Sequence, residues 1–483
     1  MNLQVVQRIL GVLLMVFSLT LVPPMVVGLI YREAAATVFL WTLLITFILG
    51  LLIWLPVRRL HRDMRIRDGF IVVAMFWSVL GLFGALPFVF AEELPLSFTD
   101  AVFESLSGLT TTGATVIIGL DRLPRAILYY RQQLQWLGGM GIIVLAVAVL
   151  PMLGIGGMQL YRAETPGPIK DAKLTPRITE TAKTLWFIYV TITILCGLAY
   201  WLAGMSAFDA LAHAYSPVAI GGFSTHDASM GHFDSPVVML IAVVFMLLSG
   251  ANFALHFVVV QGLDPRIYWQ DDEFRAYILV IATVALITIA YLYFTGTFEA
   301  LHESLLHGVF QVVSIATTTG FTTTEYFVWP GFLPVLLLFT SFIGGCAGST
   351  GGGMKVIRFL LLYKQGFREI LRLIHPTAQV PVKLGNKAVP DRVIDAVWGF
   401  FALYVVSFAV MLLTLMATGL DQVTAFSAVA ACINNLGPGL GDVGANFAAI
   451  NAPAKWVLCF AMLLGRLEIF TLLVLLTPAF WRR

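Results

Sequence analysis

The chain has 483 residues, of which 59% are hydrophobic and only 12% are charged, whereas an average soluble domain is about 25% charged. Because this few charged residues cannot cover a water-facing surface, the composition excludes a soluble protein. It indicates that lipid covers most of the chain. The formal net charge of +2 is too small to indicate binding to nucleic acid.

Residue types that bind metals are scattered along the chain. The cysteines lie in apolar stretches without metal-site spacing, so they are interpreted as packing residues. Among the histidines, His302 and His307 come closest to a pair, but at five residues apart they do not share a helix face well. We therefore expect neither a catalytic metal nor a resident cofactor. The cysteines are Cys196, Cys346, Cys432 and Cys459.

Ten apolar stretches are long enough to cross a membrane, which takes about 20 residues in a helix. The first has no small-residue cleavage site, so it is predicted to be a retained transmembrane helix and not a signal peptide. The ten predicted spans are 6–30, 36–56, 70–90, 132–155, 184–204, 236–262, 276–296, 331–362, 394–418 and 454–480.

Basic residues gather in three of the polar joints and at the C-terminus, and such residues favour the cytoplasmic side of a membrane. If both termini are inside, the even number of spans places all of these basic segments in the cytoplasm. Arg122, Arg125 and Arg131 are exceptions near one outer end. The basic residues are Arg58, Arg59, Arg62, Arg65, Arg67, Arg162, Lys170, Lys173, Arg177, Lys183, Lys364, Arg368, Arg372, Lys383, Lys387, Arg392, Arg482 and Arg483.

After a two-helix unit at 1–62, one pattern recurs in 63–160, 161–263, 264–375 and 376–483. Each repeat has an outward helix, a short amphipathic stretch, a glycine-centred and mostly hydroxyl-rich turn, and an inward helix. The predicted fold is therefore an all-α integral membrane protein, with four pseudo-repeated helix–pore loop–helix units around a central ion pathway and an additional N-terminal two-helix unit. The aligned glycines are Gly113, Gly222, Gly320 and Gly437.

The amphipathic stretches before the turns are predicted to be half-helices that descend into the membrane. Each has an acid near its start, where the helix dipole favours one: Asp100, Asp209, Glu299 and Asp421. Their negative carbonyl ends would point inward, and carbonyl oxygens in the glycine turns would replace the hydration shell of an ion. Threonine hydroxyls would add ligands and anchor the turns. One such turn alone would favour an ordinary connecting loop, but four in register favour a filter for alkali cations.

The inward helix of the third repeat is interrupted at Gly344–Gly353, where six of ten residues are glycine. Each glycine costs about 1 kcal/mol relative to alanine within a helix, so this stretch is predicted to be a flexible loop inside the membrane. It is not a phosphate-binding loop, because Met354 intervenes before Lys355 and Val356 follows it. Lys355 either lines the inner vestibule or marks the cytoplasmic interface.

Arg466 is the most suggestive charge in the chain, because an intramembrane charge is costly and usually functional. By residue count it lies as deep as Gly344, roughly 20 Å inside the outer end. We expect it to face the pore below the filter and to contact the glycine loop; the alternative is a structural ion pair with Glu468 or with another helix. Asn252 and His256 share a helix face, and an interhelical hydrogen bond is favoured over ion contact.

These features together resemble a known family. The four-fold pattern, the break Gly-Gly-Cys-Ala-Gly-Ser-Thr-Gly-Gly-Gly-Met-Lys at 344–355 and the helix Gly-Arg-Leu-Glu-Ile-Phe at 465–470 resemble the Trk/Ktr/HKT superfamily of cation transporters over essentially the whole chain. The additional two-span unit at the start looks like the TrkH branch of bacterial potassium uptake proteins. The resemblance implies that filter carbonyls coordinate potassium, that the glycine loop is a gate, and that Arg466 is a pore arginine.

Carried onto this sequence, the resemblance implies two sets of site residues. The filter and potassium-binding residues are Thr111, Thr112, Gly113, Ile220, Gly221, Gly222, Thr318, Thr319, Gly320, Asn435, Leu436 and Gly437. The gate residues are Gly344, Gly345, Gly348, Ser349, Thr350, Gly351, Gly352, Gly353, Lys355 and Arg466.

The resemblance also implies a homodimer in a bacterial cytoplasmic membrane, each protomer having its own pore. A peripheral cytosolic, nucleotide-binding subunit similar to TrkA would supply the ligand sensing that this chain lacks. Glycine at position 113 favours potassium, because serine there goes with sodium transport in related plant proteins. The first and third turns have two threonines before the aligned glycine, whereas the second has Ile220-Gly221 and the fourth has Asn435-Leu436.

The leading functional hypothesis is potassium uptake through a gated, channel-like pore. The alternative is a sodium-preferring or proton-coupled cation symporter of the same architecture. The repeats are parallel and not inverted, and few intramembrane carboxylates are present to relay protons, with Glu468 as the main candidate. An enzyme would need clustered acids, histidines or a nucleophile at a common depth, and the sequence indicates none.

Overall fold

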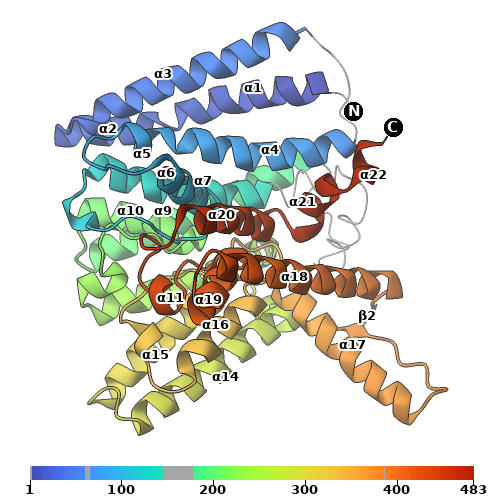
Figure 1. Cartoon of the computed structure of the whole chain (residues 1–483). Coiled ribbons are helices and arrows are strands. Elements are labelled where there is room, and N and C mark those ends of the chain that lie inside the picture. The colour runs from blue at the N-terminus through green and yellow to red at the C-terminus, as the bar shows by residue number, and fades with distance from the viewer. Residues whose placement is uncertain (1–2, 60–65, 145–177, 386, 483) are drawn as a thin grey trace.

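The computed structural model describes residues 3–59, 66–144, 178–385 and 387–482, nearly all of which lie in helices or in connections between them (Figure 1). The end of the predicted span 132–155 lies outside these residues. So do several of the basic residues assigned to the cytoplasmic joints: Arg62, Arg65, Arg162, Lys170, Lys173, Arg177 and Arg483.

The N-terminal unit is a helical hairpin that packs on one side of the molecule (Figure 1). Its elements are α1 (Leu3–Leu19), α2 (Val22–Tyr31), α3 (Ala35–Trp54) and η1 (Leu55–Val57). Gly11 and Gly50 let the two long helices approach closely, since a Cβ on Gly11 would lie 2.8 Å from the Gly50 carbonyl oxygen. The hairpin contacts the first repeat through α4 (Ile66–Gly84) and α7 (Arg125–Val144).

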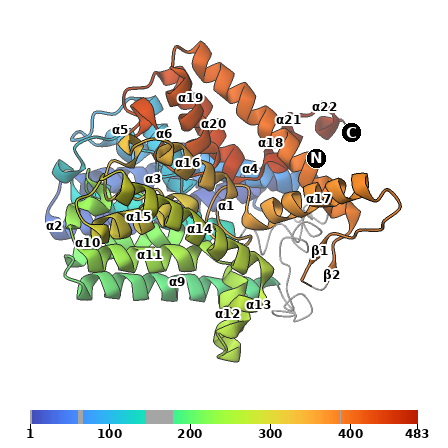
Figure 2. The ribbon, with the colours of Figure 1, turned by 90° about the horizontal axis from the view of Figure 1, so that it is seen from below.

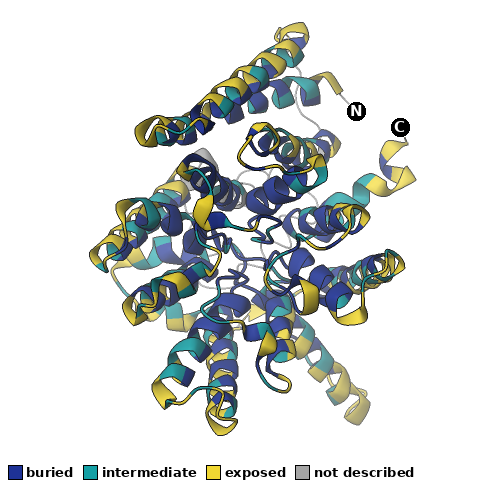
Figure 3. Cartoon of the chain, turned by 60° about the vertical axis from the view of Figure 1, so that its left-hand side comes forward, coloured by how far each residue is buried: buried dark blue, intermediate teal, exposed yellow. Residues whose placement is uncertain are grey.

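The remaining helices are arranged around a centre of buried, short segments (Figure 3). Each repeat contributes an outer helix, a short pore helix and an inner helix. The outer helices are α4 (Ile66–Gly84) with α5 (Leu86–Phe90), α9 (Ile178–Leu202), α14 (Asp272–Phe294) and α18 (Asp391–Ala417). The pore helices are α6 (Phe98–Leu109), α10 (Ala207–Ala219), α15 (Leu301–Ala316) and α19 (Gln422–Ile433). The inner helices are α7 (Arg125–Val144), α11 (Pro236–Gly250), α16 (Leu333–Ile343) and α20 (Ala452–Arg466).

Short elements complete the chain. After each filter turn comes a 3₁₀ helix: η2 (Leu120–Arg122), η5 (Ser229–Phe233), η6 (Tyr326–Val328) and η7 (Gly441–Val443). The inner-helix extensions are α12 (Phe253–Gly262) with α13 (Arg266–Gln270), α17 (Val356–Ile374), and α21 (Ile469–Leu476) with α22 (Pro478–Trp481). The antiparallel strands β1 (Lys383–Leu384) and β2 (Lys387–Ala388) join α17 to α18. Helices α12 and α17 project from the body of the molecule (Figure 2).

Side-chain caps explain where three of the four pore helices begin. Ser97 and Ser206 accept hydrogen bonds from the backbone N–H groups of Asp100 and Asp209, and Asp421 caps α19 in the same way. The third pore helix begins later than predicted, at Leu301, so Glu299 precedes it and Glu303 is the acid in its first turn. The other three predicted acids do lie at pore-helix starts.

Two spans that the sequence predicts to be continuous are each broken into two helices in the structure. The span 236–262 is divided into α11 and α12, which meet at 98°, and the span 454–480 is divided into α20 and α21, which meet at 119°. Among the described residues, six helices are long and apolar enough to cross a membrane, and up to eight if each bent pair counts as one span. The span 331–362 breaks at Gly344, as its glycines predict.

The first of these bends exists because the glycine loop passes through it. Cys346 N donates to the Gly250 carbonyl at 2.8 Å, and Phe253 N donates to the Gly348 carbonyl at 3.1 Å. The loop therefore takes over hydrogen bonds that would otherwise continue the helix, and Asn252 starts a new one by accepting from Ala254 N. These partners lie about a hundred residues apart in sequence, so no local pattern predicts the bend.

Candidate functional site

The four filter turns share one backbone conformation although their sequences differ. In each turn, the aligned glycine and the residue two positions before it have positive φ angles. The pairs are Thr111 (53°) with Gly113 (80°), Ile220 (55°) with Gly222 (80°), Thr318 (67°) with Gly320 (86°), and Asn435 (52°) with Gly437 (95°). Positive φ is uncommon for residues other than glycine, and for a β-branched residue such as Ile220 it indicates a functional constraint.

The four turns close into a ring. Each aligned glycine lies against the carbonyl of the residue that precedes the glycine of the next repeat, and the fourth lies against the first. A Cβ on Gly113 would lie 2.0 Å from the Gly221 oxygen, and a Cβ on Gly222 would lie 2.1 Å from the Thr319 oxygen. A Cβ on Gly320 would lie 2.0 Å from the Leu436 oxygen, and a Cβ on Gly437 would lie 2.8 Å from the Thr112 oxygen. Only glycine fits at such close approach. The twelve predicted filter residues are therefore brought together around one axis.

Direct hydrogen bonds also join the fourth repeat to the first. Asn435 Nδ2 donates to Thr112 Oγ1 at 3.0 Å, and Phe447 N donates to the Thr115 carbonyl at 2.7 Å. The asparagine that replaces a threonine in the fourth turn thus connects neighbouring turns. A residue that makes the fourth turn irregular in sequence therefore bonds it to the first turn.

The threonine hydroxyls mainly anchor the turns. Thr110 Oγ1 lies 2.8 Å from Thr112 Oγ1 and donates to the Leu106 carbonyl at the end of the pore helix. Thr317 and Thr319 repeat the same 2.8 Å contact in the third turn. The Thr111 hydroxyl is buried and has no hydrogen-bond partner among the described residues. Its predicted role as an ion ligand is compatible with that position and stays a prediction.

The loop Gly344–Gly353 lies directly beneath the ring, against the C-terminal ends of three pore helices. Thr350 Oγ1 donates to the Val218 carbonyl at 3.0 Å, Gly352 N to Thr318 Oγ1 at 2.7 Å, and Gly353 N to the Asn434 carbonyl at 3.0 Å. A Cβ on Gly352 would lie only 1.9 Å from the Asn434 oxygen. All ten predicted gate residues are in this loop or next to it, and Lys355 donates to the Gly351 carbonyl.

Arg466 makes the contact with the glycine loop that the sequence predicts. It is 4% exposed, and its guanidinium donates to the Thr350 carbonyl at 3.0 Å and to the Gly138 carbonyl at 3.4 Å. The alternative partner, Glu468, instead accepts from Arg358 at 2.9 Å. Arg466 therefore joins the fourth repeat to the loop of the third and to the inner helix of the first.

The structure thus brings four glycine turns into one closed ring, with the glycine loop and Arg466 packed against it. The family described as TrkH, cation transport protein, matches residues 35–483. The chain belongs to this family.

Relatives in this family match nearly the whole chain. It is 58% identical to the Trk system potassium uptake protein TrkH of Vibrio parahaemolyticus, over 98% of both chains. It is 56% identical to the TrkH protein of Escherichia coli K12, over 100% of both. The crystal structure of the potassium transporter TrkH from V. parahaemolyticus superimposes with a TM-score of 0.93 at 55% identity, again covering 100% of both chains. The protein is accordingly a multi-pass membrane protein.

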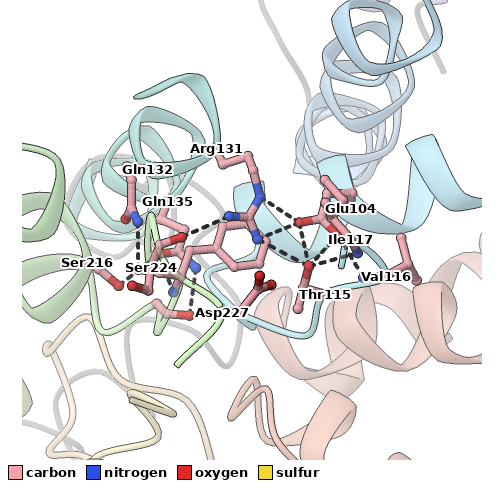
Figure 4. Close-up of polar contacts among 12 residues, drawn as sticks. Glu104, Thr115, Val116, Ile117, Arg131, Gln132, Gln135, Ser216, Ser224 and Asp227 are labelled. Atoms are coloured by element: carbon pink, nitrogen blue, oxygen red, sulfur yellow. Dashed lines mark hydrogen bonds and ion pairs between the residues drawn. The ribbon is translucent and has the colours of Figure 1, made fainter. Parts of the chain in front are cut away.

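The first filter turn is supported by a buried ion pair that sequence analysis missed. The charge pattern of the sequence makes Arg131 an outer-end exception, but the residue is fully buried and donates to Glu104 at 2.8 Å (Figure 4). It also donates to the Ser224 carbonyl at 2.9 Å and to Thr115 Oγ1 at 3.1 Å. Glu104 accepts from Val116 N at 2.9 Å. One side chain thus ties the first two filter turns together.

Two glutamines on the same helix support the second turn (Figure 4). Gln135 donates to the Gly221 carbonyl at 2.6 Å and accepts from Ser216 Oγ and from Phe223 N. Gln132 donates to the Phe223 carbonyl at 2.7 Å. The Gly221 carbonyl therefore has a protein partner, and its predicted role as a potassium ligand stays a prediction. The run of polar residues at the start of an apolar span was the signal available in the sequence.

Replacing Arg131 by leucine should lower stability strongly, because it leaves Glu104 buried without its counter-charge. Removing one partner of a buried pair costs about 3–5 kcal/mol. The thermal unfolding temperature of the purified protein in detergent measures the effect. The double change Arg131→Leu with Glu104→Gln should cost less than the sum of the single changes; strictly additive losses would show that the two side chains do not stabilise each other.

A second acid that the sequence analysis did not select bonds the glycine loop and the start of the helix that follows it. Glu273, on α14, is buried and accepts from Ala347 N at 2.7 Å and from Ile357 N at 3.2 Å. Hydrogen bonds to a charged group contribute about 1.5–3 kcal/mol each. We expect Glu273→Ala to accelerate hydrogen exchange of the amides of 344–353, as measured by mass spectrometry. Glu299→Ala, at an exposed site, is the matched control; equal exchange in both variants would contradict the role of Glu273.

Proposed function

We propose that this chain takes up potassium ions across the bacterial cytoplasmic membrane through a gated, channel-like pore. The observation that carries the proposal is the closed ring of four filter turns, in which each glycine lies against the carbonyl of the next repeat. Four pore-helix carbonyl ends directed at one axis favour a cation, and an oxygen-lined ring suits an alkali ion. Relatives that match the whole chain are named potassium uptake proteins.

The gate in this proposal is the loop beneath the ring together with Arg466. The loop is bonded to the pore helices of three repeats and Arg466 connects it to a fourth, so a movement of the loop would be transmitted to the whole filter base. The positive charge below the filter would oppose a passing cation as long as the arginine stays in place. Loop displacement would then open the path.

The proposal extends to orientation and partners. Both termini would be cytoplasmic, and two copies of the chain would form a homodimer in the lipid, with one pore in each. The relatives are named as parts of a Trk system, and we propose that a cytosolic, nucleotide-binding subunit similar to TrkA controls the loop. Potassium is the cargo, so the proposal requires no resident cofactor and no enzymatic step.

Ion flux into proteoliposomes tests the proposal. Purified protein should move rubidium or potassium down a gradient, and bi-ionic current recording should show a preference over sodium, with and without the regulatory subunit. A flux that accumulates cations against their gradient only when a proton gradient is imposed would favour the symporter alternative. No flux in the presence of the cytosolic subunit would overturn the transport proposal.

A further inference from the structure

Two histidines and an aspartate meet on the loops that follow the first two filter turns. Asp121 belongs to η2, His232 belongs to η5, and His226 lies between the second filter turn and η5. One ligand atom from each of the three side chains lies within 4.8 Å of those of the other two. The histidines are six residues apart and the aspartate is more than a hundred residues away, so no sequence spacing predicts this cluster, which we call the mouth cluster.

The side chains of the mouth cluster already contact one another. His226 Nδ1 lies 2.5 Å from Asp121 Oδ1, and the rings of His226 and His232 are stacked with centroids 3.5 Å apart and planes 4° apart. The other ring nitrogen of His226 lies 3.4 Å from Asp209. Two parallel imidazoles with a carboxylate at their edge present two nitrogen ligands and one oxygen ligand to the same small volume.

The backbone around the mouth cluster is held in place by hydrogen bonds between repeats. Gly119 N donates to Asp227 Oδ1 at 3.0 Å, which fixes the Asp121 loop against the second repeat. Gly231 N donates to the Thr322 carbonyl at 3.2 Å, which fixes the His232 loop against the third. The ligands therefore need side-chain rotations but no refolding of the loops to close around an ion. Such preorganisation is what a binding site requires.

The ligand set indicates which ion fits. Zn²⁺ suits a site that has two imidazole nitrogens, one carboxylate oxygen and a fourth position left open for water. Potassium is bound by oxygen ligands, so it would compete poorly for the two imidazoles. The carboxylates of Asp121 and Asp209 both lie against His226 and supply negative charge that favours a divalent cation.

We propose that Asp121, His226 and His232 bind Zn²⁺ at the mouth of the pore, and that the bound ion slows potassium entry. On binding, Zn²⁺ takes the place of the proton between His226 and Asp121, which is released to solvent. Because one proton leaves, the ion would then add one net positive charge to the loop that continues directly from the second filter turn, where it would repel an approaching cation. The inhibitory part rests on the proposed transport function, whereas the binding part does not.

Calorimetric titration of the purified full-length protein with ZnCl₂ tests binding. The wild type should bind one Zn²⁺ per protomer, and His232→Ala, which changes no filter or gate residue, should weaken that binding by about tenfold or more. His302→Ala, at another exposed histidine on the third pore helix, is the matched control and should bind as the wild type does. Unchanged thermal unfolding of His232→Ala shows that the variant is folded. Absent binding by the wild type, or binding that survives His232→Ala, would overturn the site.

Rubidium uptake in the presence of external Zn²⁺ tests the inhibition separately. Uptake by the wild type and by His302→Ala should fall when Zn²⁺ is added, and uptake by His232→Ala should be insensitive to it. Zn²⁺ binding with unchanged uptake would overturn the inhibitory role. If no sample transports rubidium, the proposed transport function fails, and the titration alone decides whether the metal site exists.

Discussion

Replacing Gly113 by serine is expected to lower the preference for potassium over sodium by on the order of tenfold, equivalent to about 1.4 kcal/mol. Gly113 has a φ of 80°, and a Cβ there would lie 2.0 Å from the Gly221 carbonyl oxygen. The serine must therefore push the first and second turns apart and move the Thr112 and Gly221 carbonyls away from their present positions. A wider ring discriminates less between ions of different size. Bi-ionic reversal potentials measure the change.

The matched control is Gly119→Ser. Gly119 has nearly the same φ, 81°, but a Cβ there meets no atom within 4 Å. This control carries the same backbone strain without the ring contact, so its selectivity should equal that of the wild type. Unchanged selectivity in Gly113→Ser would remove Gly113 from the filter. An equal loss in both variants would assign the effect to backbone strain.

Replacing Arg466 by alanine is expected to raise potassium flux by about tenfold or more in the absence of any regulatory subunit. The change removes a buried positive charge below the filter and the hydrogen bonds to Thr350 and Gly138. Charge-assisted hydrogen bonds of this kind contribute about 1.5–3 kcal/mol, which is enough to shift a two-state gate strongly toward its open state. Rubidium efflux from proteoliposomes at matched protein density measures the result.

Glu468→Gln is the control that separates the gate from the structural alternative. Glu468 lies two residues along the chain from Arg466, and this change breaks its pair with Arg358 while it leaves the Thr350 contact in place. Flux should then stay near the wild-type level. Reduced flux in Arg466→Ala together with a lower unfolding temperature would show that the arginine serves folding and not gating.

Much of the site was predictable because it depends on local chemistry. The pore helices at Phe98–Leu109, Ala207–Ala219 and Gln422–Ile433 begin at hydroxyl or acidic caps, and these signals are readable within four residues. The third pore helix lacks a side-chain cap, and there the predicted start was wrong. The break at Gly344 was likewise readable, since a run of glycines destabilises any helix wherever it lies.

By itself, the sequence determined the number of repeats, the positions of the four filter glycines and the loop beneath them. These depend on apolar run length, on charge and on backbone angles that only glycine readily adopts. The tertiary structure alone decided which residues meet: the order of the ring, the pair of Arg131 with Glu104, the bend at Ala251 and the mouth cluster. Each of these joins segments distant in sequence, and hydrogen bonding across such distances leaves no local pattern. Asn435 shows the division most clearly, because it looks irregular in its own turn and yet closes the ring through Thr112.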